Sequence, residues 1–276
     1  MAEEIKKSRS LRDFGVRAVS AGAIGVAFIG SIFWGGPFGL AVVVAVVGVL
    51  AALEFYAILR RERRLPNELF GLAAVAAMPF AAALLGTRGL TATVSALVIG
   101  SLAWHIIFRQ VRSTDTAVTV YGAVYVGFTL AHLVLIRELD AGAELALATV
   151  ASVWVNDTFA YLVGTSIGRH PMAPHISPKK SWEGFIAGTI FTTGVWVAVG
   201  YLADTGISLG WLVLVGLAAS VAAVVGDLAE SRLKREASVK DSGTLLPGHG
   251  GFLDRFDSMI LVSIVTYYML VFAGAK

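Results

Sequence analysis

The sequence predicts an all-α fold, a polytopic integral membrane bundle of about nine transmembrane helices. The chain is 57% hydrophobic and only 15% charged, whereas a soluble domain carries about 25% charged residues. Its apolar residues form long blocks, and a helix needs roughly 20 of them to cross a bilayer. No segment shows the short alternation of polar and apolar residues that is typical of a membrane β-barrel.

The expected spans divide the chain into two regions. Residues 1–110 are expected to form N-terminal transmembrane helices, and residues 111–276 a transmembrane catalytic region. Polar residues interrupt two of the spans, and Gly35–Gly36–Pro37 predicts a tight turn after the first. The spans are predicted at 14–34, 37–59, 67–87, 91–109, 116–137, 143–165, 182–203, 208–229 and 256–275.

Two features of the composition exclude other classes. A basic stretch precedes the first apolar block, as in a secretory signal, but the block has no convincing cleavage site and many spans follow. We therefore expect it to remain as a span. The chain has no cysteine, which excludes disulfides, thiolate zinc sites and cysteine nucleophiles. No nucleic-acid partner is expected.

The distribution of lysine and arginine predicts the orientation in the membrane, because cytoplasmic loops are enriched in these residues. Alternate connections carry almost all of them, whereas the opposite set carries only Arg88, Arg137 and Lys276. We therefore expect a cytoplasmic N-terminus and active site, with the C-terminus on the opposite side. Two of the cytoplasmic connections, 166–181 and 230–255, are long and polar, and long loops in a compact fold are usually functional or disordered.

The segment Gly226–Ser258 has the highest density of chemically useful side chains. If the helix continues beyond the apolar run, Asp227, Glu230, Ser231 and Lys234 share one of its faces. Asp254 and Asp257 then open the last span, so carboxylates from two helix ends can converge at the membrane surface. Oxygen ligands of this kind suit Mg²⁺ together with substrate phosphates. Simpler roles are a helix cap for Asp254 and lipid anchoring for the basic residues.

A second group of candidates surrounds Asp157, an ionisable residue inside the sixth span, where charge is costly. Its alternative role is a structural hydrogen bond to Ser152 or Tyr161. Lys179 and Lys180 are candidates for binding phosphate, and Glu183 for capping the seventh span. Trp182 suits either the membrane interface or stacking on a base.

Other polar residues are weaker candidates. Glu54 lies near the cytoplasmic end of the second span, where it either reaches the interface or pairs with Arg60. His105 and His132 are interpreted as buried packing groups, and His249 is the one histidine that we place at the site. The sequence contains no phosphate-binding G-x-x-x-x-G-K-[ST] loop, no H-E-x-x-H and no nucleophile elbow.

The segment from Ser231 to Asp257 resembles the signature of the phosphatidate cytidylyltransferases, or CDP-diacylglycerol synthases. SPKKSWEG at 177–184 and Asp157 with Ala160, Tyr161 and Gly164 resemble two further hallmarks of this family, while the N-terminal half is similar in hydropathy only. The signature positions that match are Ser231, Leu233, Lys234, Arg235, Lys240, Asp241, Gly243, His249, Gly250, Gly251, Asp254, Arg255 and Asp257.

The resemblance implies that CTP and phosphatidic acid are joined to give CDP-diacylglycerol and pyrophosphate at the cell membrane. It also implies dependence on Mg²⁺, alone or with a second cation, and a homodimer. The alternatives are a polyprenol kinase, an ether-lipid cytidylyltransferase or, in another class, a transporter.

The implied site residues fall into three sets. The catalytic set is Asp227, Asp254, Lys234, Arg235, Lys240, Asp241, His249 and Arg255. The substrate-binding set is Ser177, Lys179, Lys180, Glu183, Ser231, Gly250 and Gly251. The metal ligands are Asp227 and Asp254, followed by Asp257 and Asp157.

Overall fold

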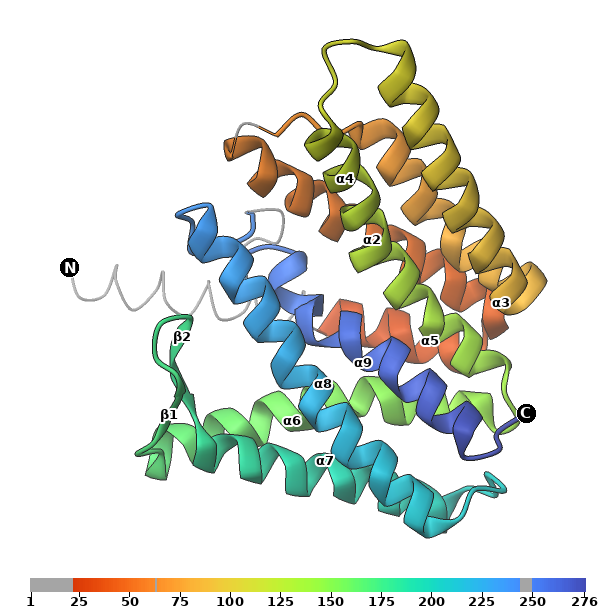
Figure 1. Ribbon diagram of the computed structural model, residues 1–276. Helices are drawn as coiled ribbons and strands as arrows, with labels where there is room; N and C mark the ends of the chain where they lie inside the picture. The colour runs from red at the N-terminus through yellow and green to blue at the C-terminus, as the bar shows by residue number, and fades with distance from the viewer. Residues whose placement is uncertain (1–21, 63, 244–249) are drawn as a thin grey trace, which may run out of the picture.

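The computed structural model describes residues 22–62, 64–243 and 250–276, and it is a bundle of helices with one small β-hairpin (Figure 1). Seven of the described helices are long and apolar enough to cross a membrane. The protein is therefore a multi-pass membrane protein, and the predicted helical class is confirmed. The exact count of nine spans stays a prediction, because the first span begins outside the described residues.

The N-terminal region contains a short apolar helix, Gly22–Phe33, followed by α2 (Gly36–Arg61) and α3 (Glu68–Ile107). At Gly86 the backbone leaves helical geometry, with φ at 59° and ψ at −142°. Figure 1 shows the chain reversing direction within α3, and Gly100 in the second arm packs against Phe70 in the first. The two predicted spans 67–87 and 91–109 correspond to these two arms.

The next membrane segment, Ser113–Glu138, consists of α4 (Ser113–Gly122), a π-helical stretch η1 (Ala123–Phe128) and α5 (Thr129–Glu138). Small residues let the π-helical stretch approach its neighbours, because Gly127 packs against Val75 and Met78 of α3. This segment is the most buried of the seven, and α5 packs on α2, α3 and α9.

The connection predicted at 166–181 is a β-hairpin, with β1 (Pro171–Ala173) antiparallel to β2 (Ser177–Ser181). It joins α6 (Gly142–Ile167) to α7 (Trp182–Leu202). The Ser181 hydroxyl accepts a hydrogen bond from the Gly184 amide at 3.2 Å and so caps α7. Ser181 therefore provides the side-chain cap, and Glu183 lies in the first turn of α7, the place that we predicted for it.

The last two helices are α8 (Leu209–Glu236) and α9 (Leu253–Phe272). The predicted loop 230–255 was too long, because α8 continues seven residues beyond its predicted end at 229. Ion pairs of Glu230 with Lys234 and of Arg232 with Glu236 support this extension at i,i+4 spacing. The face shared by Asp227, Glu230, Ser231 and Lys234 is thus formed.

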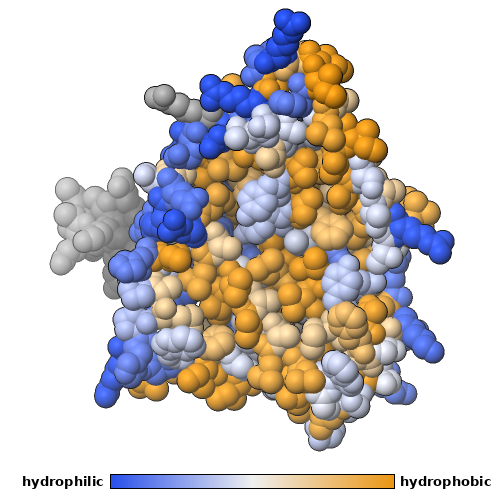
Figure 2. Space-filling view, viewed as in Figure 1, coloured by the Kyte–Doolittle hydropathy of each residue, from blue (hydrophilic) through white to orange (hydrophobic). Residues whose placement is uncertain are grey.

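The connections gather at two ends of the bundle in the predicted alternation. At one end Arg60 pairs with Glu68, and the Leu65 amide donates to Asp115 at 3.0 Å. At the other end the Arg137 side chain donates to the carbonyl of Ile32 at 2.7 Å. Figure 2 shows hydrophobic residues over most of the face between hydrophilic margins, as expected for a surface in contact with lipid.

We predict that Gly86→Ala destabilises the fold by about 1–3 kcal/mol, because a side chain at this backbone conformation is strained. Thermal unfolding in detergent measures the effect. Gly194→Ala in α7 is the matched control, since Gly194 has helical backbone and no atom within 4 Å of the added methyl group. Equal unfolding temperatures for the two variants would contradict the assignment of Gly86 as the turn between two arms.

Candidate functional site

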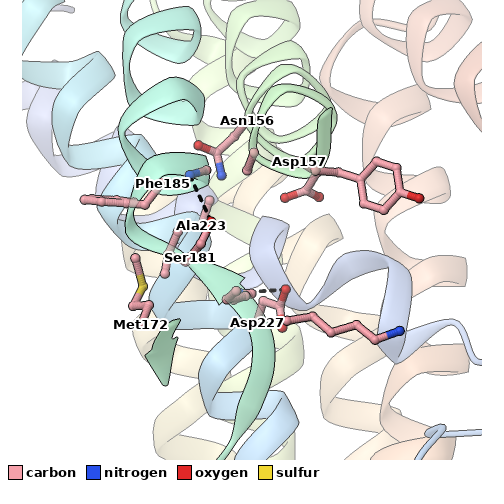
Figure 3. Close-up of a pocket in the computed structure, with 13 residues that line it drawn as sticks. Asn156, Asp157, Met172, Ser181, Phe185, Ala223 and Asp227 are labelled. Carbon is pink, nitrogen blue, oxygen red and sulfur yellow. Dashed lines mark hydrogen bonds and ion pairs between the residues drawn. The ribbon is translucent and has the colours of Figure 1, made fainter. Parts of the chain in front are cut away.

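A cavity of about 230 Å³ opens among α6, α7, α8 and the β-hairpin. Asp157 of α6, Asp227 of α8 and the hairpin lysines Lys179 and Lys180 line it together with apolar side chains. Figure 3 shows Asp157 and Asp227 facing the same space, with Ser181 and Phe185 beside them. The structure therefore brings together the two acidic residues that the sequence placed in separate segments.

Close packing of α6 on α7 determines this geometry. A methyl group on Gly184 would lie 2.6 Å from the Ala160 carbonyl oxygen, so only glycine allows the helices to approach this closely. Next to Asp157, the buried Asn156 accepts a hydrogen bond from Ser220 of α8 at 3.0 Å. Asp157 is thereby held at the cavity. Ser152 donates to the Ala148 carbonyl at 2.7 Å, so it is not the structural partner of Asp157.

Asp227 is the best-connected acid of the cavity. One carboxylate oxygen lies 2.7 Å from the Lys180 ammonium, and the other accepts from the Ser231 hydroxyl at 3.1 Å. The pair joins the hairpin to α8, and its side chains are only about one quarter to one third exposed. In such a pair the lysine can exchange its partner for a phosphate group, and the carboxylate can exchange its partner for a cation.

A second charged group lies further along α8. The Lys234 ammonium lies 2.6 Å from Glu230, which is fully buried, and 2.6 Å from Asp254 of α9. Two carboxylates therefore hold Lys234, which is 12% exposed. The other Asp254 oxygen accepts from the amides of Ser242 and Gly251, both at 3.0 Å. Asp254 thus organises the loop before α9 as well as opening the helix.

Asp257 links the two groups. It is buried on α9, where its carbonyl oxygen lies against the backbone of Gly226. Its carboxylate interacts electrostatically with those of Asp227, Glu230 and Asp157. We refer to the line of side chains from the cavity along the α8–α9 contact as the polar seam, which comprises Asp157, Lys180, Asp227, Asp257, Glu230, Lys234 and Asp254.

Glu54 of α2 extends this arrangement into the N-terminal region. It is 4% exposed, and it accepts from the Ser242 hydroxyl at 2.8 Å and from the Leu253 amide at 3.0 Å. Neither predicted role was right, since Glu54 is buried and Arg60 pairs with Glu68 instead. The one available signal was a carboxylate inside an apolar span, the same signal that identified Asp157.

The remaining predicted residues lie around these groups. Arg235 donates to the Ile176 carbonyl at 3.4 Å, and Glu183 bonds the His170 ring at 2.6 Å. Ser177 begins β2, and Gly250 has a positive φ of 85° that favours glycine. His249 lies outside the described residues. Exposed side chains at this end are Lys179, Lys240, Asp241 and Arg255.

The donor set is compatible with a divalent cation that also binds phosphate. Within the described parts of the chain, no three acidic or histidine side chains form a ready metal site. Mg²⁺ needs only one or two protein carboxylates when phosphates and water complete its shell. A carboxylate offers about four acceptor directions, and Asp227 and Asp254 receive two and three contacts from described residues.

These features define a class: a multi-pass helical membrane protein with a charged site near one end of its bundle. The chain belongs to the cytidylyltransferase family, whose sequence model matches residues 16–273. The match extends through the N-terminal half, where the sequence alone suggested similarity in hydropathy only.

Curated relatives give the same indication. The chain is 40% identical over 149 residues to a phosphatidate cytidylyltransferase of Bacillus subtilis, covering 54% of this chain and 55% of that protein. Proteins of the same name from Staphylococcus haemolyticus and Staphylococcus aureus are 38% and 39% identical over 157 residues, covering 57% of this chain and 60% of each relative. The chain therefore spans little more than half the length of these relatives.

We predict that Lys234→Met lowers the free energy of unfolding by about 3–5 kcal/mol, because it leaves the buried carboxylates of Glu230 and Asp254 without their cation. The control on the same helix is Arg232→Met, whose pair with Glu236 is exposed and worth about 0.2–1 kcal/mol. Unfolding in detergent compares the two. Similar losses of unfolding free energy in the two variants would contradict the role of Lys234 as the buried partner of Glu230 and Asp254.

Proposed function

We propose that this protein transfers the cytidylyl group of CTP to phosphatidic acid, forming CDP-diacylglycerol and releasing pyrophosphate. The supporting observation is the cavity in which Lys180 and Asp227 meet beside exposed apolar residues of the bundle. Tyr161 lines the cavity, and it is at least half exposed, as are Trp182 and Ile186 at the start of α7, which suits acyl chains in a bilayer. Both a lipid phosphate and a soluble nucleotide can reach such a place.

The proposed chemistry is an in-line displacement. A phosphate oxygen of phosphatidic acid forms a bond to the α-phosphorus of CTP, and the bond from that phosphorus to the bridging oxygen breaks. Pyrophosphate leaves with the electron pair. A phosphomonoester has its second pKa near about 6, so the attacking phosphate is largely dianionic at neutral pH and needs no strong base. Catalysis then consists of positioning and electrostatic stabilisation.

Mg²⁺ is the proposed cofactor, with or without a second cation. Asp227 and Asp254 are the proposed ligands, with Asp257 and Asp157 as the next candidates. The residue types support this proposal, because carboxyl groups outnumber lysines along the polar seam and a bound cation would offset their negative charge on ionisation. When bound, the ion would neutralise phosphate charge.

The cationic side chains are proposed to hold the two phosphate groups. Lys180 and Lys179 line the cavity. Lys180 can exchange its contact with Asp227 for one with a phosphate group, which carries more negative charge than a carboxylate. Arg235, Lys240 and Arg255 lie at the exposed end, where the nucleotide would arrive. The glycines Gly250 and Gly251 let the backbone pack closely beside Asp254, whose carboxylate the Gly251 amide contacts, and Ser231 orients Asp227.

The proposed location is the cell membrane, with the site and the N-terminus on the cytoplasmic side. The alternating ends of the bundle and the concentration of basic residues at one of them support this orientation. The homodimer implied by the resemblance stays a prediction.

We predict that Asp227→Asn and Asp254→Asn each lower the rate of CDP-lipid formation by at least about a hundredfold, because each removes a proposed carboxylate ligand of the Mg²⁺ ion that would neutralise the transferring phosphate. Purified protein with radiolabelled CTP, phosphatidic acid and Mg²⁺ provides the measurement. Asp204→Asn, in an exposed loop at the opposite end, changes the net charge equally and should leave the rate unchanged.

The products of this assay also separate the alternatives. Label transferred to a different lipid phosphate would support a related cytidylyltransferase, and a phosphorylated lipid alcohol would support a kinase. Full activity in both aspartate variants, with intact folding, would mean that their carboxylates serve the structure alone.

We predict opposite labelling for single cysteines at the two ends of the bundle. Because the natural chain has no cysteine, each introduced thiol reports its own position. In sealed cells a membrane-impermeant maleimide should label Thr87→Cys and Asp204→Cys, whereas Glu62→Cys and Gln110→Cys should react only after the membrane is opened. The reverse result would invert the proposed orientation while leaving the fold intact.

A further inference from the structure

We propose that Glu54 is a positioning residue for Asp254, acting through Ser242, so that the N-terminal helices hold part of the reaction site in place. The inference rests on the function proposed above for its catalytic consequence. Glu54 belongs to α2, far from the site in sequence, and 188 residues separate it from Ser242. A single buried carboxylate in the N-terminal region thus contacts the segment that precedes α9.

The contacts place Glu54 at both ends of that segment. The same carboxylate oxygen accepts from the Ser242 hydroxyl at 2.8 Å and from the Leu253 amide at 3.0 Å. Gly243 and Gly251 lie directly against the carboxylate, because a methyl group on either would overlap it. Glycine at these two positions is therefore required by the approach of Glu54.

Ser242 transmits the position of Glu54 to Asp254. Its amide donates to the Asp254 carboxylate at 3.0 Å, and its hydroxyl accepts from the Asp254 amide at 3.3 Å. The Ser242 hydroxyl consequently contacts Glu54 and Asp254 at once. Movement of this serine would displace the carboxylate oxygen that Gly251 also contacts, while the other oxygen remains with Lys234.

Burial makes this arrangement stiff. Glu54, Ser242 and Leu253 are all buried, and a buried carboxylate holds its donors strongly because water does not compete for them. Partners behind a metal ligand commonly change metal affinity or activity by about 10- to 100-fold when they are removed. This size of effect is expected for Glu54 even though it contacts no substrate.

The test compares Glu54→Ala, Glu54→Gln and Ser242→Ala with a control, Glu68→Gln. Glu68 is a carboxylate at the same end of the bundle, and its ion pair is with Arg60. We expect Glu54→Ala to lower kcat and raise the Mg²⁺ concentration for half-maximal activity by about tenfold or more. Glu54→Gln, which keeps an acceptor oxygen, should recover most of the loss, and Glu68→Gln should match the wild type.

A second measurement is independent of catalysis. Hydrogen–deuterium exchange should accelerate at residues 242–243 and 250–254 in Glu54→Ala and Ser242→Ala, and the double variant should exceed the faster single variant only slightly, because both remove one linkage. If exchange is faster in these variants but the wild type forms no CDP-lipid, the linkage from Glu54 to Asp254 is supported and the proposed function is rejected. Unchanged exchange and unchanged Mg²⁺ dependence in Glu54→Ala would overturn the inference.

Discussion

The contact between α8 and α9 brings several carboxyl groups together within a few helical turns of a membrane protein. The fold must pair or separate these groups, and the packing of the neighbouring helices depends on how it does so. Asp227, Glu230, Asp254 and Asp257 lie along this contact, where little water is present to screen them, so they could not all be ionised together without repelling one another. Lys180 and Lys234 offset part of that repulsion through contacts of 2.7 and 2.6 Å. Burying charge without partners would cost several kcal/mol per group. The spacing of the acids and lysines therefore restricts how α7, α8, α9 and the hairpin can pack.

The packing of small residues makes this charged arrangement possible. Gly226 allows the backbone of α9 to approach α8 at Asp257, and Gly184 allows α6 to approach α7 at Ala160. Larger side chains at either place would separate the carboxylates from their lysines. The N-terminal helices contribute through Glu54, which contacts the segment before α9. The fold is thus one body in which packing between apolar helices places the charges, and the match of one family over residues 16–273 agrees with this unity.

Much of the fold followed from hydropathy and charge, because both act locally along the chain. The long apolar blocks predicted the helices, and the alternation of basic connections matched the two ends of the bundle. The end of α8 was misplaced, since its last turns carry charge and are stabilised by pairs such as Glu230 with Lys234. The hairpin at 171–181 and the role of Glu54 were not predictable in the same way. Both depend on contacts between distant segments, and Glu54 meets residues 188 or more positions away.

The proposed reaction places two physical requirements on the candidate site. A lipid substrate keeps its chains in the bilayer, so its phosphate can be reached only at headgroup depth, whereas a nucleotide remains in water. Asp157 and Lys180 line a cavity together with apolar and aromatic side chains, of which Tyr161 is largely exposed. A deeper site would exclude the nucleotide, and one farther from the membrane would require the lipid to leave it. The extension of α8 beyond the apolar run and the hairpin after α6 both bring charged side chains to the same end of the bundle. Carboxylates at this site would repel the proposed phosphate substrates unless cations intervened, so the proposed reaction needs the lysines and a divalent ion to act together.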